Sequence, residues 1–82
     1  MTTGDISVNI HDLPVTLWVG KAGVESVTEE LASQLEDREY VKVKVLRSAR
    51  HETTIDAVAS RLAQQVDGTI VDVRGHTVVL TS

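Results

Sequence analysis

The chain has 82 residues, enough for one domain with a small core but too few for a deep catalytic cavity in a monomer. It contains no cysteine, which excludes a disulfide framework, a thiol nucleophile and a cysteine-based zinc site. Its net charge is −4, and no apolar stretch approaches the about 20 residues of a membrane span. The N-terminus has neither a basic start nor a long apolar run, so we expect a cytoplasmic, membrane-free protein without a signal peptide.

The first 13 residues differ in pattern from the rest. Ile6, Val8 and Ile10 alternate with polar residues, and Pro14 favours an extended conformation at the residue before it. This segment is predicted to be an extended arm or an added edge strand, and residues 14–82 are predicted to form the domain.

Within that domain, strand and helix patterns alternate. Apolar residues at helical spacing predict two helices, and period-two alternation or short apolar runs predict four strands. The expected elements are a strand at 15–19, a helix at 24–38, a strand at 40–46, a helix at 54–66, and strands at 69–74 and 76–81 around a hairpin turn at Gly75.

Two short motifs mark the ends of the second helix. Thr53 and Asp56 have the spacing of a capping box, with Asp in place of Glu. Asp67-Gly68 predicts a helix stop in which Gly68 takes the left-handed conformation.

The order of elements is β-α-β-α-β-β, which predicts an α/β fold of the two-layer α+β sandwich type. Helical crossovers join parallel strands, so the four-stranded sheet should be mixed, with both helices on one face. We expect the helices to share a core with Val41, Val43, Val45, Val71 and Val73. The opposite face of the sheet should be open.

Between the first strand and the first helix lies Gly20-Lys21-Ala22-Gly23. Glycines let the backbone approach a ligand closely, the helix that follows offers unpaired N–H groups, and Lys21 adds a full charge. This is the chemistry of a loop that grips a phosphate backbone. The spacing is neither that of a nucleotide-binding P-loop nor that of a dinucleotide fingerprint, and a plain turn is the alternative.

The basic residues cluster although the chain is acidic. Residues 38–50 carry a net charge of +4, and the remaining residues carry −8. A local basic field can bind a polyanion even when the net charge is negative. The alternatives are a solubilising strand edge and, for Arg47 and Arg50, ion pairs with Glu39 or Glu52.

Three motifs in register resemble one known family. Leu17 to Gly23, Val41 to Arg47 and Val73 to Leu80 are similar to the Gly-Lys-x-Gly loop, second strand and closing hairpin of the CRM domain, the chloroplast RNA splicing and ribosome maturation domain. The resemblance spans residues 14–80. It implies a fold similar to the C-terminal domain of bacterial translation initiation factor three.

The resemblance also implies a function. Stand-alone YhbY-like members bind RNA and are associated with the precursor of the large ribosomal subunit, and their loop is compared with the Gly-x-x-Gly clamp of KH domains. We therefore expect a protein that binds RNA, specifically ribosomal RNA, most simply as a monomer. The candidate RNA-binding residues are Gly20, Lys21, Ala22, Gly23, Lys42, Lys44, Arg47, Arg50 and Arg74.

No catalytic, cofactor or metal site is predicted. The three histidines lack metal-ligand spacing, and adjacent carboxylates such as Glu29-Glu30 fit a solvated helix face. The alternative function is protein–protein interaction through the open sheet face or the acidic helices, because the basic N-terminal helix usual in the family is missing.

Aromatic residues are scarce: there is no Phe, and Trp18 and Tyr40 are the only large aromatics. This argues against an aromatic platform on which several bases stack. Trp18 should point away from the helices. We expect it to pack under the N-terminal segment, with stacking on a base as the alternative.

Overall fold

The computed structural model describes residues 10–50 and 53–82. Short 3-10 turns separate the regular elements of this part of the chain. In chain order the elements are η2 (Ile10–Asp12), β1 (Val15–Val19), η3 (Val24–Val27), α1 (Thr28–Asp37), β2 (Val41–Val45), η4 (Arg47–Arg50), α2 (Ile55–Val66), β3 (Thr69–Arg74) and β4 (Thr77–Thr81).

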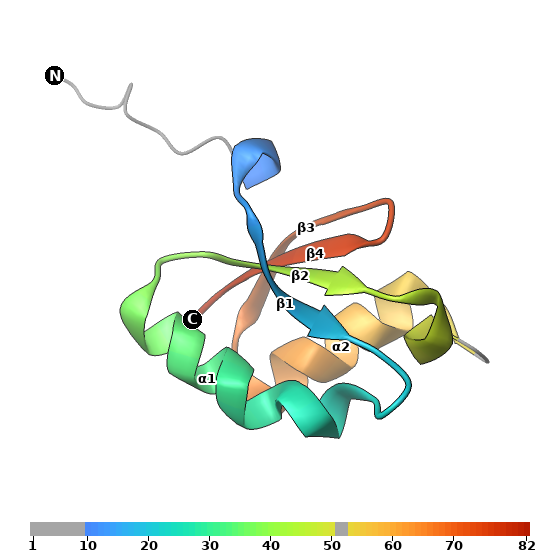
Figure 1. The fold of residues 1–82 in the computed structure, drawn as a ribbon. Coiled ribbons are helices and arrows are strands. Elements are labelled where there is room, and N and C mark those ends of the chain that lie inside the picture. The colour runs from blue at the N-terminus through green and yellow to red at the C-terminus, as the bar shows by residue number, and fades with distance from the viewer. Residues whose placement is uncertain (1–9, 51–52) are drawn as a thin grey trace, which may run out of the picture.

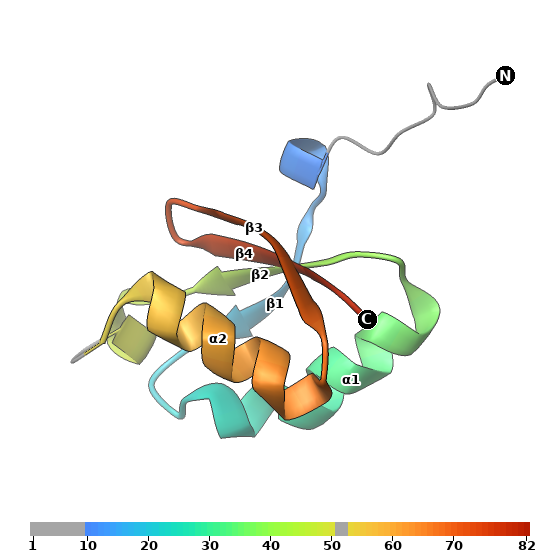
Figure 2. The ribbon, with the colours of Figure 1, turned by 180° about the vertical axis from the view of Figure 1, so that it is seen from behind.

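The strands form one mixed sheet in the order β1-β2-β4-β3. β1 and β2 are parallel, and β4 is antiparallel to both β2 and β3. Both helices cover the same face of the sheet, as opposite views show (Figures 1 and 2). The predicted two-layer α+β fold is confirmed.

The core lies between the helices and the sheet. Period-two alternation along β2 directs Val41, Val43 and Val45 into it, and all three side chains are buried. They pack with Leu31 and Leu35 of α1, Val58 and Leu62 of α2, and Val78 and Leu80 of β4. Within the described residues, no polar or charged side chain is buried.

One predicted core residue is wrong. Val71 is 38% exposed, whereas Val73 packs against the core as expected. The register of β3 shifts between Ile70 and Asp72, so that Ile70 pairs with Leu80 while Asp72 pairs with Val79. Val71 is therefore the extra residue of a bulge, and the strict alternation that would have turned it inward is lost.

β1 contains a second irregularity, between Val15 and Leu17. Here Thr16 turns toward α1, where its hydroxyl donates to Oε1 of Gln34 at 2.6 Å. The Gln34 amide in turn donates to the Thr16 carbonyl at 3.0 Å. This reciprocal pair ties the edge strand β1 to α1 and satisfies a backbone carbonyl at the irregular position.

The first helix is shorter than predicted. Residues 24–27 form the 3-10 turn η3, and α1 begins only at Thr28. Val27 has φ −117° and ψ 3°, which breaks α-helical geometry between the two elements. Apolar spacing alone does not distinguish these helical types, because a single 3-10 turn and an α turn place Val24 and Val27 on similar faces.

The ends of α2 also differ from prediction. Thr54, not Thr53, is the N-cap, and its side chain accepts a hydrogen bond from the Ala57 N–H at 3.1 Å. At the other end Asp67, not Gly68, is left-handed, with φ 56°. Gly68 is needed for another reason, because a Cβ there would lie 2.9 Å from the Thr81 carbonyl oxygen.

The N-terminal arm or added strand remains a prediction, since residues 1–9 lie outside the described residues. The end of that segment, Ile10–Asp12, forms the 3-10 turn η2 rather than a strand. The prediction of a domain over residues 14–82 likewise stays a prediction.

A matched pair of substitutions tests the bulge. Val78→Ala removes two buried methyl groups, and we expect it to lower the free energy of unfolding by about 2 kcal/mol. The same change at Val71 should cost no more than about 0.5 kcal/mol, because its side chain is exposed. Urea unfolding measures both, and equal losses would show that Val71 belongs to the core.

Candidate nucleic-acid interface

The candidate site forms where three chain segments meet at one edge of the sheet. Because β1 and β2 are parallel, the loops that follow them leave at the same edge (Figure 1). The Leu46 N–H donates to the Val19 carbonyl at 2.8 Å and extends the pairing to the start of both loops. The β3–β4 turn joins them, since the Val45 N–H donates to the His76 carbonyl at 2.7 Å.

The glycine loop and η4 lie directly against each other. A Cβ built on Gly20 would be 3.5 Å from Cδ1 of Leu46 and 3.8 Å from Oγ of Ser48. Arg47 neighbours both of these residues in sequence and is exposed. Lys21, on the loop, is exposed as well. The structure thus brings together basic residues that are 26 positions apart in sequence.

The loop itself is a tight turn. The Gly23 N–H donates to the Gly20 carbonyl at 2.9 Å, and this places Lys21 and Ala22 at an exposed tip. Gly23 has φ 89° and ψ −177°, a conformation essentially restricted to glycine. The Gly23 carbonyl then accepts from the Ser26 hydroxyl at 2.8 Å, which fixes the exit of the turn.

The sequence argument that an α-helix N-terminus supports the loop has to be corrected. The element that follows Gly23 is the four-residue turn η3, and α1 starts beyond it. A macrodipole acts only within the first turn of its own helix, so α1 adds little at the loop. Any attraction of an anion to the loop therefore comes mainly from Lys21 and the neighbouring basic side chains.

The open face of the sheet continues the basic surface. Cross-strand register places Trp18, Lys44, Thr77 and Arg74 in one row across all four strands. Lys44 and Arg74 are exposed. This row starts two residues before the glycine loop and ends at the hairpin turn, so it runs along the same edge.

Lys42 belongs to a second row and is only half-buried. It lines a hollow of about 300 Å³ on the open face together with Ile10, Asp72, Arg74, Thr77 and Val79. Val79 is only 3% exposed although it is outside the main core, because η2 and the long polar side chains surround it. Both lysines lie on the open face, but Lys42 is less exposed than Lys44.

Arg47 does not pair with Glu39, because the two residues flank opposite ends of β2. A five-residue strand separates its ends by more than about 13 Å. Arg50 ends η4, so its backbone lies at the candidate edge. Glu52, the other alternative partner for these two arginines, lies outside the described residues.

Sequence reasoning missed one ion pair beside the loop. Arg61 of α2 pairs with Glu25 of η3, and the two side chains are 57% and 60% exposed. Glu25 also lies close to Gly23, since a Cβ there would be 3.5 Å from its Oε1. Arg61 thus neutralises a carboxylate beside the glycine loop. Helical spacing contains no signal for a contact between residues 36 positions apart.

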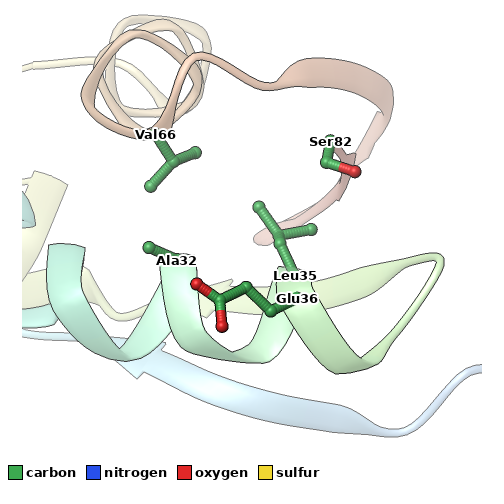
Figure 3. A pocket seen from close by; sticks show the side chains of 5 residues that line it. All are labelled: Ala32, Leu35, Glu36, Val66 and Ser82. Carbon is green, nitrogen blue, oxygen red and sulfur yellow. The ribbon is translucent and has the colours of Figure 1, made fainter.

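Acidic side chains gather on the helical layer. Glu29, Glu30, Glu36 and Asp37 of α1 and Asp56 of α2 are all exposed. Near the end of α1 a second hollow, of about 470 Å³, is lined by Ala32, Leu35, Glu36, Val66 and Ser82 (Figure 3). These side chains come from α1, α2 and the end of β4, away from the glycine loop.

Other classes of site find no support in the described part of the chain. Among residues 10–50 and 53–82, no three His, Asp or Glu side chains are grouped to hold a metal ion. None of the helices described is long and apolar enough to cross a membrane.

Comparison with known proteins identifies the family. The model of the CRS1/YhbY (CRM) domain matches residues 6–80. The chain belongs to the CRS1/YhbY (CRM) domain family. The match confirms the resemblance carried by the glycine loop, the second strand and the hairpin, and it begins earlier than those motifs.

Two known proteins are similar to this chain in sequence or structure. The chain is 39% identical over 70 residues to "Probable RNA-binding protein MJ0652" of Methanocaldococcus jannaschii. That match covers 85% of this chain but 52% of the relative, so the chain spans about half of the relative's length. SAV1595 of Staphylococcus aureus, described as a candidate RNA-binding protein, has a solution structure that matches with a TM-score of 0.70 and 26% identity. The match covers 87% of this chain and 73% of SAV1595.

The two loop glycines have different structural roles, which a pair of alanine substitutions tests. Gly23→Ala should lower the free energy of unfolding by about 1–3 kcal/mol, because alanine is strained at φ 89° and ψ −177°. Gly20→Ala meets only ordinary contacts and should change it by less than about 1 kcal/mol. Thermal or urea unfolding gives both values. Equal losses would mean that Gly23 does not require its left-handed backbone.

Proposed function

We propose that this CRM domain binds RNA through the Gly20–Gly23 loop and the adjacent basic surface, and that its RNA is ribosomal RNA of the assembling large subunit. One observation carries the proposal. Parallel pairing of β1 and β2 places the loop against η4, so that Lys21 and Arg47 share one exposed edge. The names of the two relatives support RNA as the ligand.

The site contacts the RNA backbone rather than reading a sequence. Lys21 binds a phosphate as a point charge at the tip of the turn, while Arg47 and Arg50 offer forked contacts. Gly20, Ala22 and Gly23 leave room for the sugar–phosphate chain to approach the loop. Lys44 and Arg74 continue the contact across the open face, with Lys42 at its inner side.

Binding of this kind needs no cofactor and no catalytic group, and we propose that the domain acts as a monomeric, cytoplasmic, non-enzymatic binding module.

A second candidate function is the docking of another protein. The exposed acidic face of α1 and the hollow beside it favour this alternative. Substitutions can distinguish the two functions. RNA binding should be sensitive to changes at the loop edge, and protein docking to changes on the acidic face of α1.

A loop variant tests where RNA binds. Lys21→Asp with Ala22→Asp places negative charge at the tip of the turn, and we expect RNA affinity to fall at least about 100-fold. Fluorescence anisotropy with a labelled single-stranded RNA measures the affinity. The free energy of unfolding should change by no more than about 0.5 kcal/mol, since both residues are exposed.

The matched control is Arg38→Asp with Ser33→Asp, which makes the same change in charge at an exposed position within α1 and at the residue that follows the helix. It should lower the affinity only slightly. If both variants weaken binding equally, the loop has no special role.

The assignment to ribosomal RNA is tested separately, by sequencing the RNA that is crosslinked to the protein in cells. A lack of enrichment of large-subunit ribosomal RNA would contradict this assignment.

The salt dependence of binding tests the basic surface. If about four phosphates are neutralised, a plot of log K against log salt concentration should have a slope near −3 for single-stranded RNA. Replacing Arg47 and Arg50 with Gln should flatten the slope by about 1.4, because each arginine accounts for one phosphate. Arg38→Gln, at the far end of β2, should leave it unchanged. A slope that the double replacement does not alter would identify the cluster as a solvated strand edge.

A further inference from the structure

Within the described part of the chain, Trp18 has no packing role that would explain why it is exposed. Its side chain is 52% exposed on the sheet face opposite the helices, and it is the most exposed large hydrophobic residue in the described part of the chain. It belongs neither to the core cluster nor to the residues packed against that cluster. Exposing an indole costs hydrophobic free energy that a polar residue at this position would avoid.

The expected packing of Trp18 under the N-terminal segment finds no support among the described residues. The described end of that segment, η2, instead contributes Ile10 to the hollow formed with β2, β3 and β4. Residues 1–9 lie outside the described part of the chain. The described part of the chain leaves the indole half exposed and accessible to a ligand.

The surroundings of Trp18 indicate what kind of ligand fits. Lys44 is its cross-strand neighbour on β2, and Arg74 ends the same row on β3. Gly20 follows two residues later on the same chain, about 7 Å along the strand direction. The indole of Trp18 therefore lies between the glycine loop and the exposed cations Lys44 and Arg74.

From this arrangement we propose that Trp18 stacks on one unpaired base of a single-stranded RNA segment whose phosphates contact the glycine loop and Lys44. The proposal rests on the RNA-binding function proposed above and adds the conformation of the RNA. A phosphate held at the start of the loop lies about 7 Å from Trp18 along the strand direction, close enough for the attached base to reach the indole. Every base has a flat π face, so one tryptophan gives affinity without sequence preference.

Base pairing would prevent this contact. In a duplex the faces of the bases are stacked on one another, and an RNA helix offers proteins mainly its shallow minor groove and its phosphates. The site should therefore favour single strands, loops or bulges over continuous duplex. Phosphate contacts alone would not discriminate in this way, because both forms of RNA present phosphates.

The experiment uses the fluorescence of the full chain, in which Trp18 is the only tryptophan. Titration with a single-stranded 12-nucleotide RNA should quench this fluorescence, and a hairpin duplex of matched composition should quench it much less. In parallel, anisotropy of the labelled single strand measures affinity for the wild type, Trp18→Leu and Trp18→Phe. We expect Trp18→Leu to bind between about 5-fold and about 150-fold more weakly, and Trp18→Phe to retain most of the affinity.

Failure of this proposal is distinguishable from failure of the proposed function. Normal anisotropy binding by Trp18→Leu, or equal quenching by single strand and duplex, overturns the stacking proposal and leaves RNA binding intact. Absence of an anisotropy change with the wild type overturns both. Single-stranded RNA carrying abasic positions adds a test without any protein variant, since replacing the stacked base should weaken binding by a similar factor.

Discussion

The candidate site depends on the parallel pairing of β1 and β2. Two strands that run in the same direction must send their following loops out at the same edge, whatever the loops contain. The hydrogen bond from Leu46 to Val19 carries this pairing to the last residue before the glycine loop. Antiparallel pairing would have put Lys21 and Arg47 at opposite ends of the molecule. The association of loop and arginine is thus a property of topology, and no direct bond between them is required.

Much of the fold follows from local patterns. The valines of β2, the apolar stripes of the two helices and the glycine hairpin each specify one element, and short connections leave few ways to join them. The errors occur where a contact distant in sequence decides the local backbone. Val71 faces solvent because β3 bulges against β4, and Gly68 is needed because Thr81 lies so close to it. Neither partner is visible within a window of neighbouring residues.

The candidate site was predictable to a similar extent. The loop and the basic residues were recognisable by type, and topology brings Lys21, Arg47, Lys44 and Arg74 to one edge and one face. The difference between Lys42 and Lys44 was not predictable, because η2 adds Ile10 to a hollow that Lys42 lines and Lys44 does not. The pairing of Glu25 with Arg61 likewise depends on how η3 and α2 pack.

The separation of charge between the two layers has a consequence for how the molecule moves. Carboxylates are exposed on α1 and α2, whereas basic groups are exposed at the loop edge and along the row of Lys44. Such a distribution gives the protein an electric dipole moment, and a highly charged polyanion exerts a torque on it. If that polyanion is the RNA proposed above, the molecule would rotate as it approaches and arrive with its sheet already turned toward the phosphates. Orientation before contact raises the rate of productive encounter, and it does so most at low ionic strength.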